Sequence, residues 1–561
     1  MCRLSAVAEP VFGLCLWFGG VLLLGGCATS SDEEAPLPRI ETKGGRHALF
    51  VDDKPFLVLA AQAHNSSNYP AALPDVWAAV DDMGANTLMI PTAWEQIEPE
   101  EGQFDFSYLE TLLAEARERD IRLVLLWFGA YKNTSPSYTP AWVKRDKERF
   151  PMLTKVDGTP SYALSPFGEE TLAADKRAFA EFMQWLADND PERTVVMVQV
   201  QNESGTYGSV RDYGPAAQTA FAAEVPAALA EPLELPPGTW EEVFGEDADE
   251  FFHAWAIGTY VGEVAAAGKA VYDLPLYTNA ALRDPFVDTD PLTYASGGPT
   301  DNVLHIWKAV APALDFLSPD IYNSDSDFYA AVLDHYSRPD NALFVSETGN
   351  SSDFARYVFE ALGHGAIGFA PFGTDYSGYG NYPLGAVETT PQTVAPFADN
   401  YAIVRPFAHE WARLSFEGKT WGAARPNDSA PEIIALNDGW AARVDYDLWQ
   451  FGDRSWVWLG DALFRDPEEN AGVLVAQLDT NEFLVTGRSA RVAFERPQGE
   501  FAMISVEEVE FDAGAWTFRR MWNGDQTDYG LNFTDRNQVV RVTLEPMSEK
   551  IEQEGQAVAE Q

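Results

Sequence analysis

Cysteine, histidine and basic side chains are scarce in this sequence of 561 residues. The three cysteines are Cys2, Cys15 and Cys27, all near the N-terminus. The rest of the chain therefore cannot form a disulfide or a zinc site with cysteine ligands. The seven histidines show no spacing typical of metal ligands, so we expect no catalytic metal and no cofactor.

Positive charge is the second deficit. Lysine and arginine number 38 against 86 acidic residues, a formal net charge of −48. Such a chain repels nucleic-acid phosphates and anionic lipid head groups, so neither is an expected partner. We also expect a saline habitat, in which screening weakens the self-repulsion.

An apolar run near the N-terminus is too short and too rich in glycine for a membrane span, and it ends in Leu24-Gly25-Gly26-Cys27. It resembles the signal peptide of bacterial lipoproteins. The resemblance implies a signal peptide over 1–26, lipidation of Cys27, a tether over 27–42 and a lipid-anchored protein of the cell envelope. Ala28 after the cysteine indicates the outer membrane. The alternative is an uncleaved anchor.

Eight short apolar runs, each ending in polar residues, follow from residue 55 on. They cover residues 55–60, 86–90, 121–127, 194–201, 274–278, 314–322, 342–346 and 366–372. Amphipathic segments separate them, one of which (107–120) carries Ser107 and Glu110 in capping-box spacing. Continuous apolar strands that alternate with helices predict a parallel sheet covered on both faces. Eight such units predict an α/β fold, a (β/α)8 TIM barrel over 43–405, with an insertion over its mouth at 131–173.

The pattern changes to period two in the C-terminal part, which predicts an antiparallel β-sandwich or jelly roll over 406–546. Asn523-Gly524 has the sequence of a hairpin turn. The acidic residues 547–561 are expected to form a solvated tail.

Two of the predicted strands end directly in a carboxylate: Glu203 on the fourth and Glu347 on the seventh. The active site of such a barrel lies at the carboxyl ends of its strands. Paired carboxylates suit glycoside cleavage, because one protonates the leaving oxygen while the other attacks the sugar.

Two segments make this expectation specific: "MVQVQNESGTYG" (197–208) and "MIPTAWEQIEPEEGQFDF" (89–106). Together with "AHNSS", "TPAWVKRDKERFP" and "HEWARLSFEGKTWGAARP", they resemble family 35 glycoside hydrolases, the β-galactosidases, over nearly the whole mature chain. The resemblance implies that Glu203 is the acid/base and Glu347 the nucleophile of a retaining enzyme. It also implies that Asn202 binds the sugar 2-hydroxyl and that Tyr322 touches the nucleophile.

The chain departs from the family at Gln201 and Ser204, where the family has glutamate and tyrosine. The seventh-strand motif matches loosely, so Glu95 and Glu98 are alternatives to Glu347.

Further candidates for substrate binding follow other strands. Trp94 and Trp127 are expected either to stack on sugars or to pack in the barrel wall. His64, Asn65 and Lys132 are expected either to bind sugar hydroxyls or to stabilise loops.

The expected function is that of an exo-acting, retaining β-galactosidase on oligosaccharides or polysaccharides. Alternatives are a family 42-type β-galactosidase, a β-glucosidase, a mannanase, a transglycosylase, or an inactive glycan-binding surface lipoprotein. The sequence leaves the oligomeric state open.

Overall fold

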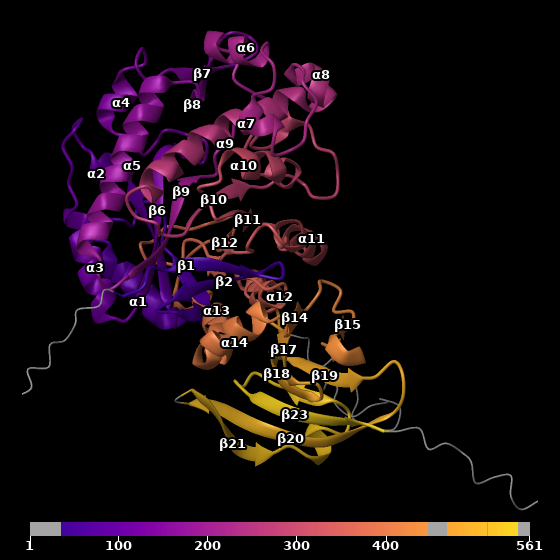
Figure 1. Ribbon diagram of the computed structural model, residues 1–561. Coiled ribbons are helices and arrows are strands. Elements are labelled where there is room, and N and C mark those ends of the chain that lie inside the picture. The colour runs from indigo at the N-terminus through magenta and orange to yellow at the C-terminus, as the bar shows by residue number, and fades with distance from the viewer. Residues whose placement is uncertain (1–34, 447–467, 513, 548–561) are drawn as a thin grey trace, which may run out of the picture. The chain divides into compact units, whose positions relative to one another are not determined.

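The computed structural model describes residues 35–446, 468–512 and 514–547, and eight parallel strands in it close into a barrel (Figure 1). These strands are β4 (Val58–Gln62), β5 (Thr87–Ala93), β6 (Arg122–Lys132), β9 (Val195–Asn202), β10 (Leu276–Ala281), β11 (Phe316–Ile321), β12 (Val345–Thr348) and β13 (Gly368–Pro371). Each corresponds to one predicted run, so the expected (β/α)8 barrel is confirmed.

The barrel strands are almost wholly buried, because side chains fill the interior and helices cover the outside. The larger helices are α1 (Leu73–Met83), α3 (Ser107–Glu118), α5 (Glu169–Asn189), α9 (Ala248–Lys269), α10 (Leu304–Val310), α11 (Ser326–Tyr336), α12 (Tyr357–Gly363), α13 (Pro391–Val404) and α14 (Ala408–Phe416). Helix α3 begins at Ser107, whose backbone N–H donates to Asp105 Oδ1 at 2.9 Å. The predicted capping box at Ser107 is therefore wrong.

A small sheet closes the amino-terminal end of the barrel. It contains β1 (Arg39–Lys43), β2 (Arg46–Val51) and β3 (Lys54–Phe56). Leu49 and Val51 of β2 pack in one cluster with inward-facing barrel residues such as Val58 and Phe344. The barrel is thus plugged at this end. The predicted tether over 27–42 extends too far, because residues 39–42 already pair in β1.

Shorter elements occupy the insertions at the other end. They are α2 (Trp94–Ile97), α4 (Ala141–Arg145), β7 (Met152–Thr154), β8 (Pro160–Leu164), α6 (Pro215–Phe221), α7 (Ala227–Ala230) and α8 (Trp240–Phe244). The insertion over 131–173 contacts the loop after β9, since Tyr207 donates its N–H to the Tyr162 hydroxyl at 3.2 Å.

Two antiparallel sheets form the C-terminal part. The first has the order β14 (Thr420–Ala424), β17 (Gly472–Asp479), β18 (Glu482–Arg488), β23 (Val539–Pro546), β20 (Phe501–Asp512), β21 (Ala515–Met521). The second has the order β15 (Glu432–Ala435), β16 (Ala441–Asp445), β19 (Ala490–Glu495), β22 (Leu531–Phe533). Residues of both sheets share one apolar cluster, so the predicted β-sandwich is confirmed.

Two details of this part differ from the prediction. Asn523-Gly524 does not turn a hairpin, because β21 and β22, on either side of it, belong to different sheets. The first strand of the sandwich begins at Thr420, and α14 before it packs against β2 and β3 of the barrel floor.

Several predictions fall outside the described residues. They concern the signal peptide, Cys27, the part of the predicted sandwich over 447–467 and the tail after residue 547. Among the helices that are described, none is both long and apolar enough to cross a bilayer.

Candidate active site

The carboxyl ends of the barrel strands surround a cavity of about 500 Å³. Its walls come from the ends of β6, β11 and β12, together with the loops after β4, β9, β10, β11 and β13. The opposite end of the barrel is covered by β1–β3.

Three carboxylic acids meet in this cavity: Glu203, Asp320 and Glu347. One carboxyl oxygen of each lies within 4.8 Å of the others. The two carboxylates expected from strands four and seven are therefore brought together, and the sequence analysis missed the third, Asp320 on β11.

Glu347 is surrounded by hydrogen-bond donors. Its Oε1 accepts bonds from Gln62 Nε2 at 3.0 Å, Asn202 Nδ2 at 3.2 Å and Asn279 Nδ2 at 3.4 Å. Its Oε2 accepts the Tyr322 hydroxyl at 2.7 Å. Four side-chain donors therefore hold both oxygens of this buried carboxyl in one orientation, as the attack of a nucleophile requires.

Glu203 has a different environment. Burial and the negative charge of Glu347 raise the pKa of Glu203 to about 7, although Lys132 opposes the shift. A carboxyl that keeps its proton near neutral pH can act as an acid, and a neighbouring carboxyl oriented by four hydrogen-bond donors can act as a nucleophile.

The chain is strained where β9 delivers Glu203. Gln201 and Glu203 have φ values of 63° and 45°, in the left-handed region that side chains other than glycine rarely adopt. Gly205 has a φ of 140°, and a Cβ there would lie 2.6 Å from the Ala295 carbonyl oxygen. The strained exit turns Glu203 toward the cavity while Gln201 faces the barrel wall.

Gln201 donates its Nε2 to Asp175 at 2.7 Å and accepts the Tyr131 N–H at 2.9 Å. It is fully buried and does not line the cavity, and neither does Ser204. The departure from glutamate at position 201 therefore leaves the three cavity carboxyls in place.

Lys132 supplies a cation close to the acids. Its Nζ donates to Asn202 Oδ1 at 2.6 Å and to Asn133 Oδ1 at 2.5 Å. Asn202 itself is fully buried, between Lys132 and Glu347. Lys132 and Asn202 thus extend the hydrogen-bond network of Glu347 to the cavity wall.

His64 and Asn65 line the mouth as expected. The His64 backbone N–H donates to Asp375 Oδ2 at 2.6 Å, and its ring lies 3.7 Å from that of Tyr379. Burial lowers the pKa of His64, which favours the neutral imidazole. Asn65 Oδ1 is buried without a protein partner, so it is available to a ligand hydroxyl.

The two candidate sugar platforms do not reach the cavity. Trp94 and Trp127 are fully buried. Trp94 Nε1 donates to Glu98 at 2.8 Å, and Trp127 Nε1 donates to Asp175 at 3.0 Å. Both indole rings pack in the buried apolar cluster outside the barrel strands. The prediction that they bind substrate is therefore wrong.

The alternatives to Glu347 are likewise elsewhere. Glu98 is fully buried and bonds to Trp94 and Arg177, while Glu95 pairs with Lys144 at 2.8 Å. Neither side chain lines the cavity.

Further residues of the site were missed or left without a role. Gln62 at the end of β4 and Asn279 on β10 both donate to Glu347, and Tyr207, Tyr379 and Asn381 come from loops. The strand-end pattern could have identified the first two. Nothing local in the sequence indicates which loop residues fold over the mouth.

Glu203, Asp320 and Glu347 form a group that could hold a cation among the residues that the structure describes. The amide N–H groups and the phenol O–H group directed at Glu347 are hydrogen-bond donors. A cation would instead need neighbouring side chains that offer oxygen lone pairs, so this arrangement suits a hydrogen-bonded carboxylate.

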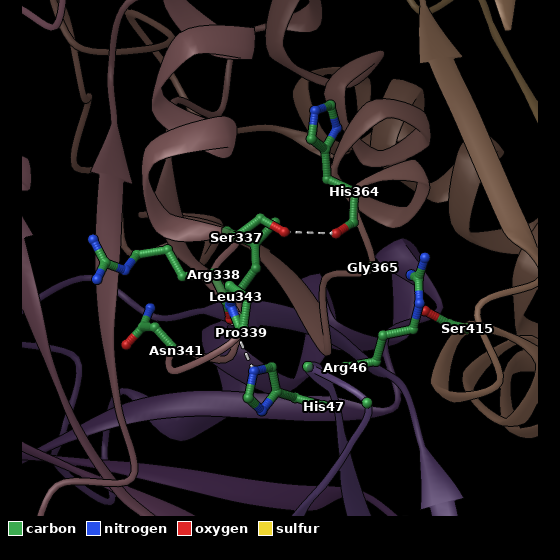
Figure 2. A pocket seen from close by; sticks show the side chains of 12 residues that line it. Arg46, His47, Ser337, Arg338, Pro339, Asn341, Leu343, His364, Gly365 and Ser415 are labelled. Carbon is green, nitrogen blue, oxygen red and sulfur yellow. Dashed lines mark hydrogen bonds between the residues drawn. The ribbon is translucent and has the colours of Figure 1, made fainter. Parts of the chain in front are cut away.

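A second cavity, of about 460 Å³, lies at the amino-terminal end of the barrel (Figure 2). It is lined by the β1–β2 turn with His47, by the loop from Ser337 to Leu343 and by His364. His47 Nε2 bonds to the Arg338 carbonyl oxygen at 3.0 Å, and Ser337 Oγ donates to the His364 carbonyl oxygen at 3.0 Å. None of the described residues that line it is a carboxylic acid, so it does not offer the carboxyl pair of the first cavity.

Comparisons with known proteins agree with the chemistry of the first cavity. The sequence model of glycoside hydrolase family 42, described as beta-galactosidase, matches residues 75–260. A second model, described as a domain of unknown function (DUF5597), matches residues 397–534. Among curated proteins, none matches the chain. The paired carboxylates and the family 42 match support a glycoside hydrolase.

Solved structures of low similarity also match. The β-galactosidase of the psychrophilic Marinomonas ef1 is 14% identical, with a TM-score of 0.47, over 64% of this chain and 62% of its own. That of Bacillus circulans sp. alkalophilus is 13% identical, with a TM-score of 0.45, over 64% and 60%. That of Rahnella sp. R3 is 15% identical, with a TM-score of 0.44, over 64% and 61%. The chain thus spans less than two thirds of these β-galactosidases.

Proposed function

We propose that this chain is a retaining, exo-acting β-galactosidase. The observation that carries the proposal is the short separation, within 4.8 Å, between carboxyl oxygens of Glu203 and Glu347 in two contrasting environments. Retaining glycosidases place their carboxyl groups ~5–5.5 Å apart, and inverting ones leave ~6.5–9.5 Å for a water molecule.

In the first step, Glu203 gives its proton to the glycosidic oxygen while Glu347 attacks the anomeric carbon. The bond from that carbon to the leaving oxygen breaks, and a glycosyl ester of Glu347 forms. Asn202, Asn279 and Tyr322 keep the attacking carboxylate oriented before the reaction.

In the second step, Glu203, now ionised, takes a proton from water, and the resulting hydroxyl attacks the anomeric carbon. The ester bond to Glu347 breaks, and the sugar leaves with its original configuration. Lys132 lies near enough to stabilise the negative charge that Glu203 carries between the steps.

Galactose as the sugar is supported by the description of the family 42 model and by the resemblance to family 35. The match favours family 42, which the sequence analysis had kept as an alternative, and it does not confirm family 35. The two families share a clan and the same pair of glutamates, so the proposed mechanism is common to both.

Exo action is supported by the enclosure of the site. The cavity has the size of a small-ligand pocket, and its floor is closed by the barrel core. Asn65 Oδ1 and Asn381 Nδ2 are buried without protein partners, and hydroxyls of a terminal sugar would satisfy them.

We also propose the localisation that the sequence predicts. Cys27 carries a lipid anchor, and the protein is attached to the outer membrane of the cell envelope. Radioactive or clickable palmitate should label the wild-type chain and not Cys27→Ser. Equal labelling of both would contradict the anchor.

A panel of 4-nitrophenyl glycosides tests the activity itself. We expect turnover of the β-galactoside, with proton NMR showing β-galactose as the first product. Turnover of only the glucoside or mannoside would reject the sugar, and α-galactose as the first product would reject retention. If the wild type binds glycans without cleaving any, the chain is a glycan-binding protein instead.

A further inference from the structure

The two-glutamate mechanism gives no role to Asp320, although a carboxyl oxygen of Asp320 lies within 4.8 Å of one on each glutamate. Its Oδ2 accepts Asn279 Nδ2 at 2.7 Å, and its Oδ1 accepts Ser346 Oγ at 3.1 Å. It is 3% exposed and contributes to the cavity wall. Ionising a buried carboxylic acid that has no cation bonded to it costs free energy. The presence of such an acid on β11 therefore requires an explanation.

The contact between Asp320 and Glu203 is informative. One carboxyl oxygen of Asp320 lies within 4.8 Å of a carboxyl oxygen of Glu203, and both groups face the same cavity. Two ionised carboxylates have acceptors only and repel each other at this distance, so the pair is stable in a buried site when one of them carries a proton. Asn279 fixes this contact, because its Oδ1 accepts the Glu203 backbone N–H at 2.9 Å while its Nδ2 holds Asp320.

We propose that Asp320 and Glu203 share one proton and that the acid/base of the enzyme is this carboxyl pair rather than Glu203 alone. Asp320 is a positioning residue, since it acts on the substrate only through Glu203. The inference rests on the proposed function and adds a residue to it.

The proton balance follows both chemical steps. When Glu203 protonates the leaving oxygen, the pair loses its only proton and becomes doubly negative. When water then attacks the glycosyl ester, its proton returns to Glu203, and Asp320 shares it again. No other donor or acceptor is consumed.

The other ionisable groups around the pair set the direction of its titration. They are Glu347, Lys132, Tyr322, Tyr207, Tyr277 and Tyr336. Burial raises the pKa of Asp320, and the charges of Glu347 and Glu203 raise it further. Two interacting acids lose their protons in separate steps, and the last proton is held to a higher pH than either acid would hold it alone.

Two substitutions should therefore move the alkaline limb of kcat/KM in opposite directions. Asp320→Asn removes the neighbouring charge and adds an amide donor to Glu203. The apparent pKa of the alkaline limb should therefore fall by about one pH unit or more. Ser346→Ala removes a donor from Asp320 and weakens its anion, so the limb should rise. Asp334→Asn, on the exposed face of α11, is the matched control and should leave the limb in place.

The rates are measured with 4-nitrophenyl β-galactoside, or with the glycoside that the panel selects, on the full chain. If the wild type is active and Asp320→Asn loses rate at every pH without a shift of the limb, the shared proton is refuted and the glycosidase function stands. If the wild type cleaves no glycoside, the proposed function fails first.

Thermal unfolding tests the pair without any substrate. The wild-type midpoint should fall between pH 6 and pH 9 as the pair is forced to ionise, and that of Asp320→Asn should fall less. Parallel curves for the two proteins would overturn the inference even where activity cannot be measured.

Discussion

At the scale of single residues, the site depends on environments that separate chemically equivalent carboxyls. Glu347 receives donors from four side chains, whereas Glu203 receives burial and a like charge. These different environments support the two roles that we propose for chemically identical side chains, a nucleophile and a proton donor.

The pH dependence of activity follows from Glu203. Its pKa is raised to about 7, and the first step requires its protonated form, so kcat/KM should fall tenfold per unit above that pH. The measurement is a pH profile with a substrate whose leaving group needs protonation. A rate that stays flat to pH 9 would contradict the assignment.

Stability should depend on the same group in the same sense as activity, because both fall as the pH rises. A carboxyl whose pKa is higher in the folded state stabilises the fold at low pH, and this stability is lost as the pH rises through about 7. Glu203→Gln should therefore be more stable than the wild type at pH 8, by about 1–3 kcal/mol, and nearly equal to it at pH 4. Denaturant unfolding at both pH values measures this; a variant less stable at pH 8 would refute it.

At the scale of elements, hydrogen bonds join the loop after β11 of the barrel to the C-terminal part of the chain. It carries Tyr322, which bonds to Glu347, and Asp325 caps α11. Asn427, just before the sandwich's second sheet, donates Nδ2 to Asp325 at 3.0 Å and accepts Arg356 Nη2 at 2.6 Å. Arg356 in turn donates to the Ser324 carbonyl oxygen at 3.0 Å.

Removing this clamp should affect catalysis at a distance. Asn427→Ala frees the loop, so Tyr322 is held less well against Glu347, and we expect kcat to fall about tenfold. Asn437→Ala is the matched control, because among the described residues the Asn437 side chain bonds to Gly418 and Gln477 and not to the loop after β11. Equal rates for both variants and the wild type would show that the clamp does not support the site.

Elements of the barrel were predictable because strand and helix leave different periodicities. All eight barrel strands and the positions of Glu203, Glu347 and Lys132 followed from apolar runs that end in polar residues. Asp320 escaped because it lies inside such a run, two residues before Tyr322, where a polar residue is easily taken for part of the strand. Trp94 and Trp127 were ambiguous because a sequence does not show which way a side chain at the end of a strand points.

Loops and edges were predicted less well. The sheet β1–β3 lies before the first barrel strand, and its burial depends on the barrel that it closes rather than on its own pattern. Asn523-Gly524 has turn residues, but the chain crosses there from one sheet to the other, because tertiary packing overrides local turn preference.

At the scale of the whole molecule, the excess of 86 acidic over 38 basic residues is the dominant feature. Self-repulsion of these charges destabilises the folded chain at low ionic strength and weakens as salt shortens the screening length to ~3 Å at 1 M. We expect the thermal midpoint to rise by several degrees, on the order of 5 °C, between 10 mM and 1 M NaCl. An equal concentration of an uncharged solute such as glucose is the control, and a midpoint that falls with NaCl would contradict the expectation.

The central claim is that Glu347 forms a covalent bond to the sugar while Glu203 serves as acid/base. The most direct test is to incubate the full chain with 2-deoxy-2-fluoro-β-galactosyl fluoride and to locate the label by peptide mass spectrometry. The account predicts one fluorogalactosyl group per chain, on the peptide with Glu347, and none in Glu347→Gln. A label on Glu203, Glu95 or Glu98, or an active enzyme that is never labelled, would contradict it.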